Sequence, residues 1–296
     1  MTKTAFIAIV GCPNVGKSSI LNEVLGQKIA IVSSKPQTTR TKIMGVLTEG
    51  ETQLVFTDTP GYHKPNNKLG EKMQQAVGET IGGVDACLFV VEAKGDIKKG
   101  EYELIERFKS LRVPVILAIN KIDMLKDNKE ELLLRIVELT KLFNFEAVVP
   151  VCASNGEKID ALVKEMNKLA VESPHFFPDD TLTDQPERVL ASEIIREKIL
   201  RLMDKEIPHG IAVSIEKMRE RDNQDILDIE ATIYCERENH KGIIIGKKGA
   251  MLKKISTYSR QDLENFFQIK VNLQTWVKVK EDWRNREGLI HNFGLD

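Results

Sequence analysis

The chain has 296 residues, of which 42% are hydrophobic and 29% charged, and its formal net charge is −1. This length predicts about two domains, and the composition is typical of a soluble globular protein rather than a disordered or fibrous one. The apolar runs are too short to span a bilayer, and residues 1–20 lack the layout of a signal peptide. Four scattered cysteines without a C-x-x-C pair favour a reducing, cytoplasmic compartment and argue against a structural zinc site.

The first 170 residues alternate strand and helix patterns, which predicts a doubly wound, mostly parallel α/β sheet. Several predicted strands are continuous apolar runs, as expected for parallel strands that are buried on both faces. The predicted strands cover residues 6–10, 53–57, 86–91, 115–120 and 147–151, and the predicted helices cover residues 17–25, 70–77, 101–109, 129–143 and 158–170. Open α/β sheets bind ligands at the carboxyl ends of their strands, so we expect the functional residues to lie there.

The pattern changes after a proline-containing stretch without helical periodicity, which predicts a linker over residues 173–186. An amphipathic helix is predicted from residue 187 to residue 206, because apolar residues recur on one stripe. The elements predicted after it are strands over 211–217 and 226–236, a helix–loop–helix over 242–258, a helical stretch over 260–267 and a strand over 270–279. We therefore predict a first domain over 1–172 and a smaller α+β domain over 187–296.

The motif G-x-x-x-x-G-K-[ST] begins at Gly11, between the first predicted strand and the first predicted helix. That context is typical of a phosphate-binding loop, whose N–H groups and helix N-terminus hold a polyphosphate. Lys17 is expected to reach the outer phosphates, and Ser18 is expected to bind Mg²⁺. The candidate nucleotide-binding residues of this loop are Gly11, Cys12, Pro13, Asn14, Val15, Gly16, Lys17, Ser18 and Ser19.

Two further segments are expected to complete the phosphate and metal site. The sequence Asp58-Thr59-Pro60-Gly61 follows a predicted strand, where an aspartate can hold Mg²⁺ through its water shell and the Gly61 N–H can bond a γ-phosphate. Residues 37–40 lie where a mobile switch would supply a threonine to the metal, and the sequence leaves open whether Thr38 or Thr39 does so.

Two other strand ends predict recognition of a guanine base. Asp123, in the sequence N-K-x-D, can accept hydrogen bonds from the N1–H and the amine of guanine, which adenine cannot offer. In the same motif Asn120 is expected to tie the loops together, and the stem of Lys121 is expected to cover the base. After the next strand, the Ala153 N–H could read the guanine O6, next to Ser154, a further nucleotide-binding candidate.

The order of these motifs resembles that of the translation-factor-related class of P-loop GTPases. The resemblance implies binding of GTP and GDP and slow hydrolysis of GTP to GDP and phosphate. It favours Thr39 over Thr38 as the metal ligand. It also implies catalytic roles for Lys17, Thr39, Gly61 and Asn14, and a magnesium ion on Ser18, Thr39 and Asp58.

Three residues bear on the rate of hydrolysis. Tyr62 stands where Ras-like proteins have the glutamine that orients the attacking water, so slow hydrolysis is expected unless something else completes the site. Relatives with asparagine at the position of Asn14 often recruit K⁺, which makes K⁺ a second candidate cofactor. His63 is a weaker candidate for a catalytic base, because a lone histidine in a switch loop is more often solvated.

The last part of the chain predicts binding of a polyanion. Residues 237–286 contain 12 Lys and Arg residues against five Asp and Glu residues, a net charge of +7. A G-x-x-G loop between short helices lets a nucleic-acid backbone approach closely, and the adjacent isoleucines offer an apolar groove for bases. The candidate RNA-binding residues are Gly242, Ile243, Ile244, Ile245, Gly246, Lys247, Lys248, Gly249 and Lys253. This pattern resembles a KH domain of the bacterial type, in which we expect Trp276 to complete the core.

A single GTPase domain joined directly to a KH domain resembles the Era-type GTPases over essentially the whole chain. The resemblance implies a monomeric bacterial assembly factor that binds the 3′ end of 16S ribosomal RNA and the 30S ribosomal subunit. It also implies peripheral association with the inner membrane. Two alternatives are an RNA-binding assembly chaperone in which GTP is mainly structural, and a P-loop kinase or ATPase.

Overall fold

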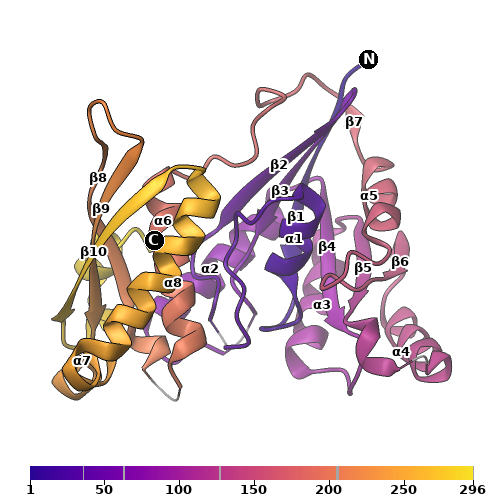
Figure 1. Ribbon diagram of the computed structural model, residues 1–296. Coiled ribbons are helices and arrows are strands. Elements are labelled where there is room, and N and C mark those ends of the chain that lie inside the picture. The colour runs from indigo at the N-terminus through magenta and orange to yellow at the C-terminus, as the bar shows by residue number, and fades with distance from the viewer. Residues whose placement is uncertain (36, 63, 127, 205–206, 296) are drawn as a thin grey trace. The chain divides into compact units, whose positions relative to one another are not determined.

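The computed structural model describes residues 1–35, 37–62, 64–126, 128–204 and 207–295, which form two compact units (Figure 1). The first unit comprises Met1–Ala30, Thr39–Lys64 and Lys72–Asp184. The second comprises Ile31–Thr38, Pro65–Glu71 and Gln185–Asp296. Within the described ranges, no helix is long and apolar enough to cross a membrane.

The first unit contains the predicted doubly wound sheet, with strand order β2-β3-β1-β4-β5-β6. Neighbouring strands from β3 to β6 are parallel, while β2 is antiparallel to β3 and β7 is antiparallel to β1. Every residue of β5 is buried, as a continuous apolar run predicts. The strands are β1 (Lys3–Val10), β2 (Ile43–Glu49), β3 (Thr52–Asp58), β4 (Ala86–Glu92), β5 (Val115–Asn120), β6 (Ala147–Pro150) and β7 (Val171–Glu172).

Helices cover both faces of this sheet, because successive side chains of a buried strand point to opposite sides. Ile7 and Ile9 of β1 pack in the cluster that contains residues of α1 and α5. Ala8 and Val10 pack in the cluster that contains residues of α2, α3 and α4. The helices are α1 (Lys17–Leu25), α2 (Lys68–Gly82), α3 (Lys99–Leu111), α4 (Lys129–Leu142) and α5 (Ile159–Asn167), with a 3₁₀ turn at Ile122–Leu125.

The strand β2 was not predicted, since its short, mixed sequence shows neither clean alternation nor a continuous apolar run. Its structure explains one unusual residue. A Cβ atom at Gly45 would lie 2.7 Å from Leu25, 2.9 Å from Leu21 and 3.1 Å from Ile29. Any larger residue would have to displace these side-chain tips, so glycine lets the strand pack closely on α1.

The segment predicted as a linker runs along the first unit as far as Asp184. The ring of Phe176 packs edge-on against Phe6 at 5.1 Å between centroids. The Gln53 side-chain amide donates to the Phe177 carbonyl at 2.9 Å, and the Val46 N–H donates to the Leu182 carbonyl at 2.9 Å. These contacts fix much of the segment on β2 and β3 although it forms no helix.

The second unit has the predicted α+β architecture, with a three-stranded sheet of order β10-β9-β8. The central strand β9 is antiparallel to β8 and parallel to β10, and α6, α7 and α8 contribute to the core of this unit (Figure 1). Its elements are α6 (Glu187–Leu202), β8 (Ala212–Glu220), β9 (Ile226–Cys235), α7 (Glu238–Ile245), α8 (Ala250–Phe267), β10 (Lys270–Val279) and α9 (Glu287–Asn292), with 3₁₀ turns at Pro208–Gly210, Lys247–Gly249 and Trp283–Asn285. The helix predicted over 187–206 ends early, because Met203 takes extended backbone angles.

The prediction that Trp276 completes the core is wrong. Trp276 lies on β10 with 43% of its surface exposed, whereas Trp283 is fully buried. The Trp283 indole N–H donates to the Gly210 carbonyl at 2.9 Å, and its ring packs edge-on against Phe293 at 5.3 Å. Trp283 therefore fills the place in the core that we expected Trp276 to fill.

Candidate nucleotide-binding site and nucleic-acid interface

The phosphate loop joins β1 to α1, and two of its glycines are required by close contacts. Gly16, the N-cap of α1, has φ +99°, and a Cβ atom there would lie 2.1 Å from Nδ2 of Asn120. Gly11 has φ +154°, and a Cβ atom there would lie 2.3 Å from the Val90 carbonyl oxygen. The loop can take this tight course only if neither position carries a side chain.

Lys17 is buried at the start of α1, and its ammonium donates to the carbonyl oxygens of Gly11 and Cys12, each at 3.1 Å. Burial lowers the pKa of Lys17, while the nearby Asp58 carboxylate opposes that shift. The ammonium therefore lies against the loop, where an anionic phosphate would stabilise its charged form.

Three oxygen ligands converge beside the loop. The Ser18 hydroxyl donates to Oδ2 of Asp58 at 2.6 Å and lies 2.9 Å from the Thr39 hydroxyl. The Thr39 hydroxyl lies 3.4 Å from the same carboxylate oxygen. Thr38 instead donates to the Lys35 carbonyl at 2.6 Å, so the structure brings Thr39 and not Thr38 to this cluster.

The cluster fits a magnesium ion. The side chain of Asp58 is fully buried, and its Oδ1 has no hydrogen-bond partner among the described residues. Burial raises the pKa of Asp58 to about 6, although Lys17 and the two hydroxyls oppose the shift. A buried carboxylate beside two hydroxyls is the hard oxygen donor set that Mg²⁺ prefers.

The D-T-P-G turn packs directly on the phosphate loop. A Cβ atom at Gly61 would lie 2.7 Å from the Cα atom of Pro13, and the Tyr62 N–H donates to the Gly11 carbonyl at 3.1 Å. The Thr59 hydroxyl donates to the Ile9 carbonyl at 2.8 Å, which ties the turn to β1. His63 lies outside the described residues.

Asn120 joins the predicted base-reading loops, as expected. Its Nδ2 donates to the Val15 carbonyl at 2.9 Å, and its Oδ1 accepts from the Ala153 N–H at 3.0 Å. In this structure the Ala153 N–H, which we expected to read the guanine O6, is donated to Asn120, and its contact with a base stays a prediction.

The Asp123 carboxylate is exposed at the end of the same loop. Its Oδ1 lies 3.1 Å from the Cys152 sulfur, which is also 3.0 Å from the Ser154 hydroxyl. The sequence pointed to Asp123 and Ser154, but it did not indicate that Cys152 lies between them.

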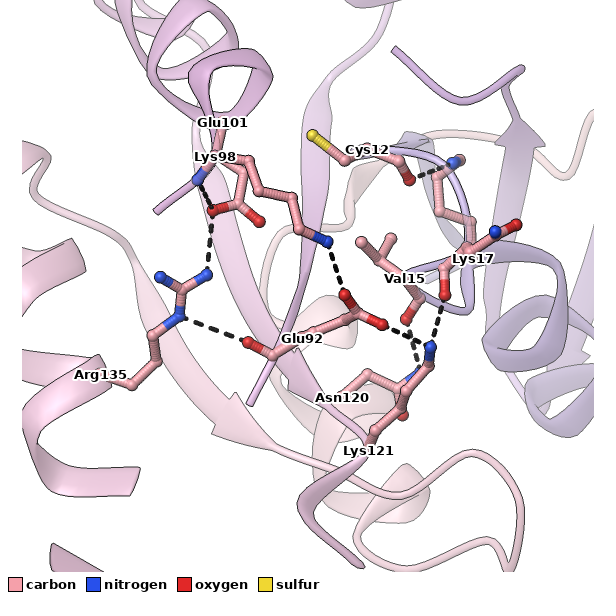
Figure 2. A network of polar contacts seen from close by, with 10 residues as sticks. Cys12, Val15, Lys17, Glu92, Lys98, Glu101, Asn120, Lys121 and Arg135 are labelled. Carbon is pink, nitrogen blue, oxygen red and sulfur yellow. Dashed lines mark hydrogen bonds and ion pairs between the residues drawn. The ribbon is translucent and has the colours of Figure 1, made fainter. Parts of the chain in front are cut away.

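Lys121 is held between the phosphate loop and β4 (Figure 2). Its ammonium donates to the Asn14 carbonyl oxygen at 2.6 Å and to Oε1 of Glu92 at 2.6 Å. The other carboxylate oxygen of Glu92 accepts from the Lys98 ammonium at 2.6 Å. Burial alone would raise the pKa of Glu92, but the hydrogen bonds from the two lysines lower it overall.

The backbone of Glu92 is tied to the neighbouring helices as well (Figure 2). Its carbonyl oxygen accepts from Nε of Arg135 at 3.3 Å, and Arg135 forms a buried ion pair with Glu101 at 2.9 Å. The same Glu101 oxygen accepts from the Lys98 N–H at 3.0 Å and caps α3. Sequence reasoning missed Glu92, Glu101 and Arg135, because no local motif marks them.

The second candidate site is the loop between α7 and α8. Gly246 and Gly249 have φ +72° and +80°, and the exposed Lys247 and Lys248 lie between them. Gly242, Ile243 and Lys253 are also exposed near this loop.

The prediction for Ile244 needs correction. Its side chain is fully buried in the core of the second unit, toward which Ile244 points from the short helix α7. Ile243 is 50% exposed, so of these two residues only Ile243 can contact a base.

A phosphate loop, a base-reading loop and a GXXG loop between two helices define a P-loop GTPase joined to a KH domain. Two family models agree with this class. A model described as 50S ribosome-binding GTPase matches residues 6–121, and a model described as KH domain matches residues 206–284.

Relatives of known name match the entire chain. GTPase Era of Clostridioides difficile (strain 630) is 51% identical over 100% of this chain and 99% of its own length. GTPase Era of Alkaliphilus metalliredigens (strain QYMF) is 47% identical over 99% of both chains. A crystal structure of an Aquifex aeolicus Era variant bound to GDP and AlF₄⁻ is 40% identical with a TM-score of 0.95, over 99% of both chains. The chain therefore belongs to the Era family and is a GTPase.

Proposed function

We propose that this GTPase binds the 3′ end of 16S ribosomal RNA through its KH domain and assists assembly of the 30S subunit. One observation is the main support. A crystal structure of Era with MgGDPNP and nucleotides 1506–1542 of 16S ribosomal RNA has a TM-score of 0.95 to this chain, with 40% identity over 100% of this chain and 99% of that chain. The chain has candidate sites for both ligands.

The nucleotide site would work mainly by fixed charges and dipoles. The loop from Gly11 to Ser19 would bind the phosphates through its N–H groups, and Lys17 would neutralise the outer phosphates. Ser18, Thr39 and Asp58 would hold Mg²⁺, which spreads the negative charge that develops on the phosphates. On this account Thr59, Pro60 and Gly61 place an N–H near the γ-phosphate.

The base site would select guanine through Asp123. The carboxylate accepts two N–H bonds that adenine does not offer, while Lys121 covers the base and Ser154 borders it. Asn120 acts indirectly, because its contacts hold the base loop against the phosphate loop. Competition between GTP and ATP for the purified protein tests this assignment, and equal affinity for both nucleotides would contradict it.

Hydrolysis is expected to be slow and to depend on K⁺. Tyr62 has no amide to orient water, so another group must complete the site. Asn14 has a left-handed backbone with φ +65°, and its carbonyl oxygen accepts from Lys121. We infer that the Asn14 side chain contributes to a K⁺ site beside the phosphates. Equal hydrolysis rates in NaCl and KCl would overturn this inference.

RNA binding is assigned to the loop and the helix ends around it. Gly246 and Gly249 let the RNA backbone approach, while Lys247, Lys248 and Lys253 provide charges for phosphates. Replacing Lys247 and Lys248 with glutamine is expected to weaken RNA binding and to reduce its salt dependence by about two phosphate contacts. An unchanged slope of log K against log salt would contradict this assignment.

The nucleotide state is proposed to influence RNA affinity. GTP would order the segments around Thr39 and Asp58, and hydrolysis would release them. Thermodynamic linkage then requires RNA to change the affinity for GTP by the same factor. If GTP is only structural, the cognate RNA will leave kcat unchanged, which separates the switch from an RNA chaperone.

The location of the protein in the cell is a separate proposal. We infer a cytoplasmic monomer that associates peripherally with the inner membrane. Fractionation of cells followed by sedimentation of the protein tests all parts of this proposal. Recovery only in the soluble fraction would exclude the membrane association.

A further inference from the structure

We propose that the outer face of the sheet in the second unit, around Trp276 and the lysines of β10, is a second RNA-binding surface. This inference rests on the proposed function, because it extends RNA contact beyond the loop at Gly246–Gly249. We call this face the β10 surface, and its residues are Lys270, Gln274, Trp276, Lys278 and Lys280.

The alternation of side chains along β10 separates this surface from the core. Val271 is buried in the core, and the Thr275 hydroxyl lies 2.8 Å from the Ser256 hydroxyl of α8. Residues of the opposite parity therefore point away from α8. Among them, Trp276 exposes 43% of its surface, and Lys278 is exposed two residues further along the strand.

The surface is positively charged as well as aromatic. Lys270 and Lys280 share the parity of Trp276, and both are exposed. The acidic residues of the neighbouring strand β9 already have partners. Asp228 accepts from Arg221 and from Asn272, each at 2.7 Å, and Glu230 lies 3.4 Å from the Lys217 ammonium. Arg221 and Lys217 therefore offset the charges of these two acids, which leaves the charge of Lys270, Lys278 and Lys280 in excess.

Single-stranded RNA matches this combination of side chains. An indole ring stacks on an unpaired base, and lysines beside it neutralise the adjacent phosphates. RNA-binding sheets of other folds use aromatic residues in this way. A GXXG loop clamps only about four nucleotides, so a longer bound RNA needs contacts outside the loop.

The position of β10 supports a continuous RNA path. It is an edge strand, and α7 and α8, which flank the loop, both contact it. A chain of nucleotides that leaves the loop can therefore reach the β10 surface without crossing another strand. An anionic membrane is the other partner that tryptophan and lysine suit, but it offers no reason for the surface to adjoin the RNA-binding loop.

The test uses the full chain and two fluorescent RNAs. One is a single-stranded RNA of about four nucleotides, the length that the loop clamps. The other spans the 16S segment named for the related Era structure. We expect Trp276→Leu to bind the long RNA about tenfold more weakly, because one stacked base is lost. The same variant should bind the short RNA with the affinity of the unaltered protein. Trp276→Phe should keep most of the affinity for the long RNA. Lys278→Gln should lower the slope of log K against log salt for that RNA by about one.

A matched control and a direct readout accompany these variants. Tyr102, on α3, is 47% exposed, so Tyr102→Leu removes an equally exposed aromatic ring outside the surface and should change neither affinity. The chain has two tryptophans, and Trp283 is fully buried. Quenching of tryptophan fluorescence by the long RNA should therefore come from Trp276 and disappear in Trp276→Leu.

Each outcome supports or overturns the inference. Unchanged binding of the long RNA by Trp276→Leu overturns it, and so does an equal loss for both RNAs, because the residue would then act on the loop. Loss of binding to phosphatidylglycerol vesicles with unchanged RNA binding would assign the surface to a membrane and also overturn it. If the unaltered protein binds neither RNA, the proposed function itself fails, which is a distinct result.

Discussion

Replacing Glu92 with glutamine removes the charge that holds Lys121 against β4. In the present structure the Lys121 ammonium is shared between Glu92 and the Asn14 carbonyl oxygen, each at 2.6 Å. Lys121 also has a left-handed backbone with φ +65°, a conformation that is uncommon for a residue with a side chain. Without the Glu92 carboxylate, the Lys121 side chain would have to become ordered when the nucleotide binds.

The size of the effect follows from the exposure of the pair. The side chains of Lys121 and Glu92 are 32% and 23% exposed, so solvent weakens their interaction. Ordering one long side chain on binding costs about 1 kcal/mol, which corresponds to roughly fivefold in affinity. Because Lys121 is proposed to contact the base and not the reacting phosphate, GTP and GDP should lose affinity equally and kcat should stay constant.

The assay is the dissociation rate of a fluorescent GDP analogue, with kcat measured at saturating GTP. Glu106→Gln is the matched control, since Glu106 pairs with Lys109 at 2.6 Å on the exposed side of α3 and touches no nucleotide residue. In a Lys121→Met background, Glu92→Gln should have no further effect on nucleotide affinity, because Glu92 is proposed to act on the nucleotide only through Lys121 and its other partner, Lys98, remains. Additive effects of the two substitutions, or a change in kcat alone, would refute the positioning role.

Four other substitutions or conditions test separate parts of the structure. Asp123→Asn should weaken GTP binding at least about a hundredfold, because the amide NH₂ cannot accept from the guanine amine and the remaining N1–H bond loses its charged acceptor. The variant should favour xanthosine triphosphate, whose C2 oxygen accepts from the new amide, and competition binding measures both effects. Thr39→Ala should raise the Mg²⁺ concentration needed for hydrolysis, whereas Thr38→Ala, whose residue contacts the Lys35 carbonyl, should not. Glu101→Gln should lower the free energy of unfolding by about 3 kcal/mol, because it leaves Arg135 charged and buried; urea denaturation followed by circular dichroism measures this loss. Burial raises the pKa of the Cys12 thiol from 9.0 to about 11, so the stability gained by the neutral thiol is present below pH 9 and is lost as the pH rises through about 11, which denaturation at a series of pH values would detect.

The sequence was sufficient where a motif and its structural context lie close together in the chain. The helix predicted from Lys17 to Leu25 has those bounds in the structure, and β10 covers the predicted residues 270–279. The continuous apolar runs also indicated strands that are buried on both faces, as β5 is. In each case the residues that form the element are neighbours in the sequence, so their pattern can be recognised without knowing the fold.

Features that depend on distant partners could not be predicted in the same way. Both tryptophans near the C-terminus are flanked by mixed polar sequence. The parity of β10 exposes Trp276. Trp283 is instead buried through its contacts with Gly210 and Phe293, which lie elsewhere in the chain. Ile244 and Ile243 are adjacent and chemically identical, yet one is buried and the other half exposed, because an eight-residue helix presents them to different sides.

The contacts of Gly16 explain why the nucleotide motifs could be interpreted from sequence while the Glu92 network could not. Gly16 lacks a side chain because the Asn120 amide occupies that space, and the same amide binds the Val15 carbonyl. The phosphate loop and the N-K-x-D motif therefore restrict each other's residue types, and the sequence shows this as glycine at position 16 and asparagine at position 120. Glu92 meets Lys121 through flexible side chains across neighbouring strand ends, and many residue pairs satisfy such a contact. Only the register of β4 on β5, which pairs Glu92 with Asn120, places that carboxylate beside the base loop.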